Sequence, residues 1–300
     1  MSDRTWCALV AANAARFGEL VAGIDPHLPD IPAAFEAGTD SWIARYVDVV
    51  LDTLEGQVGF VKFQSAYFEA CGLAGLTALS AAIKRAKAAG MGVILDAKRG
   101  DIGATAAAYA RAYLTPQAAG GSGDFEADCL TVNPLLGPDT LEPFTDCVRR
   151  YGKGIFVLCR TSNPSAGWLQ DRITGNRSIA DRLAELITTL GTPDPTAPGL
   201  SPIGAVIGAT APQEASRLRR LLPNAIILAP GLGAQGGDAT IVRLLRGDTV
   251  GDLLVPVSRG LTRVDDRTLS IKAYGQLLLD RVVAFRAIVA RGDDEALRVG

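Results

Sequence analysis

Short apolar segments recur along the 300-residue chain and alternate with longer stretches of mixed polarity. Each segment is rich in Val, Ile and Leu with few polar interruptions, which is typical of strands buried on both faces of a parallel sheet. The eight segments span residues 20–26, 59–64, 92–99, 129–134, 154–162, 203–210, 225–233 and 253–261.

The stretches between these segments predict helices, because apolar residues recur there at spacings of three and four. Residues 42–54 and 76–89 are the clearest cases, and residues 105–114 are rich in alanine. Further helices are expected over 179–190, 214–222, 239–245 and 269–289. Strand–helix alternation with eight strands predicts an α/β fold of the (β/α)8 TIM-barrel type. A doubly wound open sheet also alternates, but it usually has fewer strands and a glycine-rich first turn.

The chain is longer than the roughly 250 residues that such a barrel usually takes. Residues 6–17 predict an extra N-terminal helix that covers the bottom of the barrel. Residues 163–178 and the Pro-rich residues 191–202 predict an extended loop after the fifth strand. No linker divides the sequence, so we expect one domain over residues 1–300.

Composition limits the binding partners and the cellular compartment to be expected. The net charge is −2 without a basic block, which argues against nucleic acid or a membrane surface as partner. No apolar run approaches membrane-spanning length, the N-terminus lacks a signal-peptide pattern, and the five cysteines form no CxxC pair, so a cytoplasmic protein is expected. A single histidine excludes a multi-histidine metal site.

The third apolar segment ends in a cluster of charges, Asp96, Lys98 and Asp101. Residues two apart on a strand point the same way, so Asp96 and Lys98 should share a face. Asp101 lies past the strand end, where the loop could turn its carboxylate back or aim it elsewhere. A lysine among carboxylates is expected to stay protonated, and a fixed cation beside fixed anions suits chemistry in which charge develops.

Other polar residues also collect at strand ends, where the active sites of TIM barrels lie. Charged side chains within apolar strands are costly unless paired, so several in one layer indicate a site. These residues are Asp25, Lys62, Asn133, Thr161, Ser162, Gln235, Ser258 and Arg259.

Each candidate has a simpler interpretation. Asp25 precedes a proline and could cap a turn, and Lys62 could be an exposed lysine at the barrel rim. The charges of the third strand could form a structural ion pair. His27 is interpreted as a surface or turn residue rather than a catalyst, and Asn133 is either a turn former or a ligand.

The end of the seventh strand, residues 230–238, is rich in glycine and leads toward a helix near Asp238. Glycines let backbone N–H groups approach an anion, and the loops after strands seven and eight are the habitual phosphate site of this barrel. Arg259 closes the eighth strand and could grip a phosphate with two hydrogen bonds. The substrate is therefore predicted to carry a phosphate.

At this point the residues resemble a known family. The run from Asp96 to Ile102, DAKRGDI, is similar to the DxKxxDI signature of orotidine 5′-phosphate decarboxylases. The long loop after the fifth strand resembles the longer bacterial subgroup. The resemblance extends to GIDP at Asp25, VKFQ at Lys62, TSNP at Ser162, PGLGAQGGD at Gln235 and SRG at Arg259.

The resemblance implies decarboxylation of orotidine 5′-phosphate to UMP without cofactor or metal. It makes Lys98 the proton donor to C6 of the pyrimidine and places Asp96 near the departing carboxylate. It assigns the other residues to substrate binding: Asp25 and Lys62 to the ribose hydroxyls, Ser162 or alternatively Thr161 to the pyrimidine edge, and Gln235 and Arg259 to the phosphate. Shorter members carry an arginine near the position of Gly233, so the phosphate grip here is expected to rest more on Arg259.

The resemblance also implies a homodimer with shared sites, in which Asp101 and Thr105 reach into the neighbouring subunit. Their spacing supports this independently, because residues four apart share a helix face. A C2 dimer with two composite sites is then expected.

Three other functions compete with this prediction. A sugar-phosphate decarboxylase or aldol-type synthase of the same suprafamily would need Mg²⁺ and a further acid, but the second strand offers only Lys62. A Schiff-base aldolase would need Lys98 as nucleophile, and a protonated lysine is a poor one. A non-catalytic phosphate-binding barrel would keep Arg259 without acids around Lys98.

Overall fold

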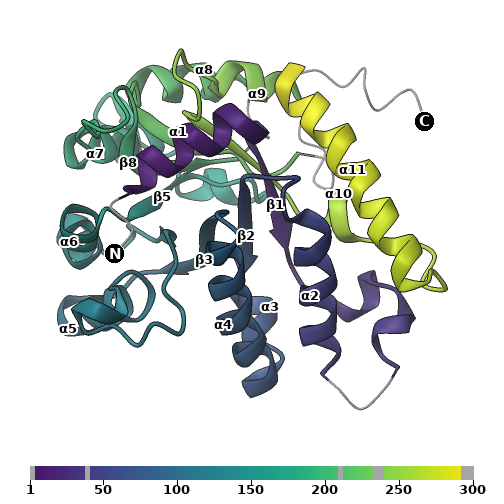
Figure 1. Cartoon of the computed structure of the whole chain (residues 1–300). Helices are drawn as coiled ribbons and strands as arrows, with labels where there is room; N and C mark the ends of the chain where they lie inside the picture. Colours follow the sequence, from purple (N-terminus) through teal and green to yellow (C-terminus); the bar gives the residue numbers. More distant parts are fainter. Residues whose placement is uncertain (1–3, 38–40, 209–211, 233–238, 292–300) are drawn as a thin grey trace.

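Eight parallel strands close a barrel in the order β1-β10-β9-β8-β5-β4-β3-β2, which confirms the predicted TIM-barrel class (Figure 1). The computed structural model describes residues 4–37, 41–208, 212–232 and 239–291. The barrel strands are β1 (Leu20–Ile24), β2 (Phe60–Gln64), β3 (Gly92–Arg99), β4 (Cys129–Val132), β5 (Gly154–Arg160), β8 (Ser201–Ile207), β9 (Ala225–Leu228) and β10 (Leu253–Val257).

Helices surround this barrel, as the periodicity predicts. The larger ones are α2 (Trp42–Leu54), α4 (Gly72–Ala88), α5 (Gly103–Tyr113), α6 (Glu142–Tyr151), α7 (Ile179–Leu190), α8 (Pro212–Leu221), α9 (Ala239–Leu245) and α11 (Ile271–Arg291), and the short ones are α3 (Ser65–Glu69) and α10 (Arg259–Thr262). The sequence pattern did not predict α6, because its buried face consists only of Phe144, Thr145, Cys147 and Val148 among charged residues.

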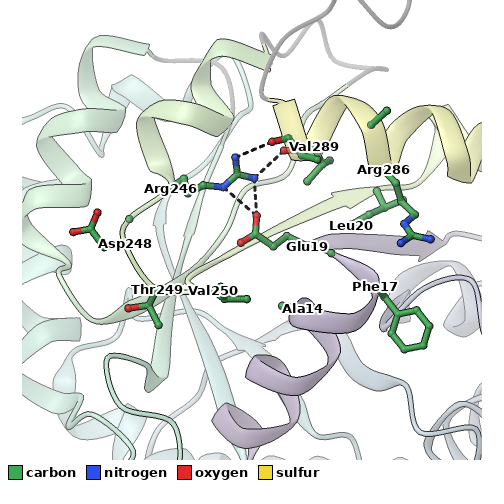
Figure 2. A pocket seen from close by; sticks show the side chains of 14 residues that line it. Ala14, Phe17, Glu19, Leu20, Arg246, Asp248, Thr249, Val250, Arg286 and Val289 are labelled. Carbon is green, nitrogen blue, oxygen red and sulfur yellow. Dashed lines mark hydrogen bonds and ion pairs between the residues drawn. The ribbon is translucent and has the colours of Figure 1, made fainter.

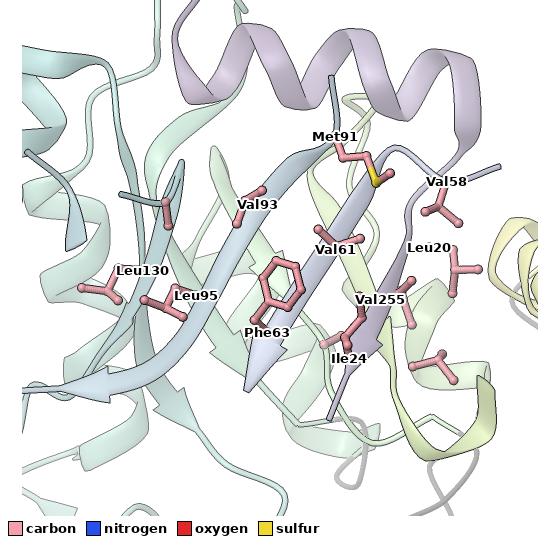
Figure 3. Close-up of a cluster of buried hydrophobic side chains, with 14 of the residues drawn as sticks. Leu20, Ile24, Val58, Val61, Phe63, Met91, Val93, Leu95, Leu130 and Val255 are labelled. Carbon is pink, nitrogen blue, oxygen red and sulfur yellow. The ribbon is translucent and has the colours of Figure 1, made fainter. Parts of the chain in front are cut away.

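Side chains alternate between the two faces of the barrel wall. On the first three strands, outward residues such as Leu20, Val61 and Leu95 pack in one large cluster against the helices (Figure 3). Inward residues such as Phe60 and Ile94 belong to a second cluster that fills the barrel interior. Because the period is two, the inward face continues from Phe60 to Lys62 and from Ile94 to Asp96.

Helix α1 (Trp6–Phe17) closes the N-terminal end of the barrel, as predicted (Figure 1). Trp6 lies edge-on to Phe60 and Phe156, with ring centroids 6.4 and 6.2 Å apart. Gly154 makes room for this indole, since a Cβ there would lie 2.3 Å from a Trp6 ring atom. This helix covers the N-terminal end of the barrel interior, and the cavity that holds the charged strand residues opens at the other end.

The predicted extended loop after β5 contains a small antiparallel hairpin, β6 (Ile173–Thr174) and β7 (Arg177–Ser178). Arg160, the last residue of β5, anchors the insertion through Asp171 at 3.0 Å and also pairs with Glu214 of α8 at 2.9 Å. The insertion is therefore fastened beside the C-terminal mouth of the barrel. Within the described ranges, no helix is long and apolar enough to cross a membrane.

Candidate active site

A cavity of about 720 Å³ opens at the C-terminal ends of the barrel strands. Its wall draws on strands β2, β3, β5 and β10, on helices α3 and α10, and on the segments that follow β1, β5 and β9. It brings together eight of the residues singled out from the sequence, namely Asp25, Lys62, Asp96, Lys98, Thr161, Ser162, Ser258 and Arg259.

Four of these side chains form a line of alternating charge. Asp96 is central, with Oδ2 2.9 Å from Nζ of Lys62 and Oδ1 2.6 Å from Nζ of Lys98. Asp25 continues the line beyond Lys62, its Oδ1 3.8 Å from the same Nζ. Lys62 is buried, so its interpretation as an exposed rim lysine is wrong, whereas 43% of the Lys98 side chain is accessible from the cavity side.

Burial and ion pairing act in opposite directions on the inner pair. Burial by itself raises the pKa of Asp96, but the ammonium groups of Lys62 and Lys98 outweigh it and hold the pKa well below its usual range. Burial lowers the pKa of Lys62, yet the carboxylates of Asp96 and Asp25 raise it above its ordinary value. Asp96 and Lys62 are therefore both charged at neutral pH.

Lys98 owes its position to an irregularity of its strand. Leu95 pairs with Leu130 and Arg99 with Val132, so three residues of β3 lie opposite a single residue of β4. Lys98 has φ of 50°, and it is the one non-glycine residue with positive φ in the described part of the chain. Such a bulge re-aims a side chain, here toward Asp96 and the cavity.

Asp25 carries an unused hydrogen-bond acceptor. Its Oδ1 is buried and has no hydrogen-bond partner among the described residues, because the contact with Lys62 is too long for one. No turn-capping hydrogen bond from its side chain is found there either. A buried acceptor left unmet costs stability, and a hydroxyl donor entering the cavity would satisfy it.

The end of β5 presents both Thr161 and Ser162 to the cavity. Thr161 is held by the insertion: its N–H donates to Oε1 of Gln170 at 2.8 Å, and its hydroxyl donates to Oδ1 of Asn163 at 2.6 Å. These bonds tie the backbone and hydroxyl of Thr161 to the insertion. Gln170 was not identified from the sequence, since nothing in an aperiodic insertion marks it.

Only part of the predicted phosphate-binding region lies within the described residues. Arg259 begins α10 at the cavity rim and is exposed, with no hydrogen bond or ion pair of its side chain to the described residues. Gly231, with φ of 117°, lies in the wall beside it. The predicted ligand Gln235 and the rest of its loop, residues 233–238, lie outside the described residues.

Asp101 and Thr105 do not join this cavity within one chain. Oδ1 of Asp101 accepts the N–H of Ile102 at 2.8 Å, at the beginning of α5, and Thr105 is exposed on that helix. Within the described residues, Asp101 therefore neither lines the cavity of its own chain nor forms an ion pair with Lys98.

Two further polar residues prove to be structural. The His27 side chain is 48% exposed and its Nδ1 lies 3.0 Å from Oδ2 of Asp30, as expected for a turn residue. Asn133 accepts the N–H of Leu135 at 3.0 Å and does not line the cavity, so it is a turn former.

Gln64, which was not identified from the sequence, supports the charged residues of the site: its side chain accepts a hydrogen bond from Nζ of Lys62 at 3.3 Å and donates one to the Asp96 carbonyl at 3.1 Å.

Comparisons with known proteins show the family of this chain. A family model described as Orotidine 5′-phosphate decarboxylase / HUMPS family matches residues 21–274. An orotidine 5′-phosphate decarboxylase of Rhodopirellula baltica is 44% identical over 229 residues, covering 74% of this chain and 76% of the relative. One from Salinispora arenicola is 38% identical over 269 residues, covering 89% and 91%.

A crystal structure from Streptomyces avermitilis, which carries the provisional name orotidine 5′-phosphate decarboxylase, superposes with a TM-score of 0.80 at 34% identity. The match covers 97% of this chain and 98% of the other. The family match spans the strands that carry Asp25, Lys62, Asp96 and Lys98. The chain therefore belongs to the orotidine 5′-phosphate decarboxylase / HUMPS family.

Proposed function

We propose that this protein decarboxylates orotidine 5′-phosphate to UMP and CO₂ in pyrimidine biosynthesis. The observation that carries the proposal is the Lys98 ammonium, held at 2.6 Å by Asp96 and facing a cavity large enough for a nucleotide. The C6–carboxylate bond breaks, CO₂ leaves, and the electron pair stays on C6. Lys98 stabilises that charge and then forms the C6–H bond by giving up a proton from Nζ.

Asp96 has two tasks in this proposal. It fixes the ammonium of Lys98 before the substrate arrives, and it lies beside the position of the departing carboxylate. No cofactor is expected to accept the electrons, so prepositioned charge has to supply much of the barrier reduction.

The sugar is assigned to the neighbouring strands. The unmet Oδ1 of Asp25 would accept a ribose hydroxyl, and Lys62 at 3.8 Å would donate to one. Ser162, or alternatively Thr161, would meet the pyrimidine edge, since both line the cavity at the end of β5.

The phosphate is assigned to Arg259 and Gln235, together with the backbone of the loop after β9. It lies far from C6, so its binding energy is available to order the site and exclude water. The exposed guanidinium of Arg259 at the cavity rim supports this assignment.

The active form would be a homodimer with shared sites. Asp101 does not line the cavity of its own chain, and Thr105 is exposed on the helix that follows. Ile102, next to Asp101, and Leu135, just past the neighbouring strand β4, are exposed apolar side chains with 62% and 68% accessibility, as expected of a surface that a partner covers. Residues 1–300 would then act as one cytoplasmic domain that completes its site by C2 pairing.

Turnover of orotidine 5′-phosphate by the purified chain, followed by ultraviolet absorbance with and without EDTA, tests the proposal. We expect stoichiometric UMP and CO₂ at a rate that EDTA leaves unchanged. A Mg²⁺-dependent sugar-phosphate enzyme of the same family would leave this substrate intact and lose its own activity to the chelator. Absence of UMP formation by folded protein would overturn the proposed function.

A further inference from the structure

Thr131 occupies the single β4 position opposite the bulge of β3. Its neighbours Leu130 and Val132 pack outward against the helices, and Cys129 packs inward, so Thr131 faces the barrel interior. The residue is 1% exposed and does not line the cavity. Figure 3 shows Leu95 and Leu130 side by side just before the strands lose their regular pairing.

The hydroxyl of Thr131 makes two hydrogen bonds, both to the catalytic strand. It accepts the backbone N–H of Lys98 at 2.9 Å and donates to Oδ1 of Asp96 at 2.9 Å. The same Oδ1 accepts from Nζ of Lys98 at 2.6 Å. A closed ring therefore runs from the Lys98 amide through Thr131 and Asp96 back to the Lys98 ammonium.

This ring compensates for what the bulge removes. The amide of Lys98 has no regular ladder partner on β4, and its left-handed backbone is an unfavourable conformation for a residue with a side chain. The Thr131 oxygen supplies the missing acceptor, and its single proton is then directed to Asp96. The buried hydroxyl of Thr131 therefore holds Lys98 at two points: it bonds directly to the backbone N–H, and through Asp96 to the side-chain ammonium.

We propose that Thr131 is a positioning residue, which sets where the Lys98 ammonium stands relative to the reacting carbon. The proposal deepens the function proposed above and rests on it. Thr131 does not touch the cavity, so its loss should misplace the proton donor without weakening the grip on ribose or phosphate. A displacement of about 1 Å is enough to cost a large factor in rate.

Thr131→Val tests this, because valine keeps the shape and removes both hydrogen bonds. We expect kcat to fall at least tenfold, with KM for orotidine 5′-phosphate and Kd for UMP within about threefold of the unchanged chain. Thr131→Ser keeps the hydroxyl and should restore kcat to within about threefold. Thr145→Val is the matched control, a buried threonine of α6 that bonds only within its own helix, and should leave kcat unchanged.

Three results would overturn the proposal: an unchanged kcat per UMP-binding site in folded Thr131→Val, a serine variant as impaired as valine, or failure of both Thr131→Val and Thr131→Ala to fold. The last result would show that the hydroxyl serves fold stability.

Absence of turnover in the wild-type chain would instead contradict the proposed function. In that case the ¹⁵N resonance of Lys98 Nζ, assigned with Lys98→Arg, still reports on positioning: it should move in Thr131→Val and stay in place in Thr131→Ser.

Discussion

The two ends of the barrel hold cavities of similar size that differ in how their charges are used. The cavity at the C-terminal end measures about 720 Å³, and a second one of about 640 Å³ lies at the N-terminal end between α1, α11 and the segment before β10 (Figure 2). At the N-terminal end, Arg246 donates to Glu19 at 2.6 Å and to the carbonyl of Val289 at 2.8 Å. At the C-terminal end, Asp25 keeps an unmet oxygen and Lys98 stays accessible.

The two cavities therefore differ little in volume. They differ in whether their central charged groups have hydrogen-bond or ion-pair partners within the protein. Arg246 ties the end of α9 to the beginning of β1 and to the last turn of α11, which is the work of a structural clamp. In the line from Asp25 to Lys98, four charged groups lie close together, Asp25 has an oxygen without a hydrogen bond, and Lys98 remains accessible. Such an arrangement costs folding energy and is retained where a ligand or a reaction completes it.

Replacing the accessible ammonium should give the largest effect. Lys98→Ala removes both the proton donor and the charge that faces the nascent carbanion, so we expect kcat/KM to fall by about 10⁴-fold or more, roughly 5 kcal/mol of transition-state stabilisation. The absorbance assay measures this on purified protein, with thermal unfolding as the check that the barrel survives. Near-normal turnover would remove the chemical distinction between the two cavities.

Mixing two inactive variants tests whether the C-terminal cavity is completed by a second chain. Lys98→Ala and Asp101→Ala should each be nearly inactive alone. After random subunit exchange, half of the dimers are mixed and each holds one site without either defect, so about a quarter of sites should recover. Mass spectrometry verifies the exchange, and no recovery in a verified mixture would place Asp101 outside the partner's site.

Removing the central carboxylate should affect both activity and stability. Asp96→Asn removes the anion that holds Lys98 and leaves the buried Lys62 with Asp25, at 3.8 Å, as its remaining carboxylate, so we expect about a 10²-fold loss in kcat and about 3 kcal/mol less stability toward urea. Asn is nearly isosteric, so a variant with unchanged rate and stability would show that the charge has no role.

The pH dependence of that stability difference follows from the lowered pKa of Asp96. The unfolded carboxyl titrates at about 3.9, and the folded one well below its usual range. The contribution of Asp96 is therefore fully present above the unfolded value and shrinks as pH falls toward the folded value. Urea titrations should give a constant gap between wild type and Asp96→Asn from neutral pH to about pH 5, and a narrowing gap below about pH 4.

The N-terminal clamp should give the smallest effect on catalysis. Arg246→Ala is expected to lower stability by about 1–2 kcal/mol, since one partly buried ion pair and hydrogen bonds to α11 are lost, while kcat and KM stay within about twofold. Glu19→Gln is the milder companion variant. A tenfold fall in kcat at full folding would show that the two ends are coupled.

The difference between the two ends also shows how far the sequence could lead. Lys62, Asp96 and Lys98 were predictable because they interrupt apolar strands whose period and barrel topology dictate where they meet. Thr131 was not predictable, because the sequence does not distinguish an inward threonine that packs in the barrel interior from one that bonds to a neighbouring strand. Its bond to the Lys98 amide depends on the bulge of β3. The direction of Asp101 depends on a loop, and Gln170 lies in an insertion without periodicity, so neither position follows from pattern.

A crystal structure of the protein with UMP bound in the C-terminal cavity tests the central assignment most directly. We expect Nζ of Lys98 to lie within about 3.2 Å of C6, with a ribose hydroxyl on Oδ1 of Asp25 and the phosphate at Arg259. A nucleotide bound with C6 turned away from Lys98, or bound outside this cavity, would contradict the assignment.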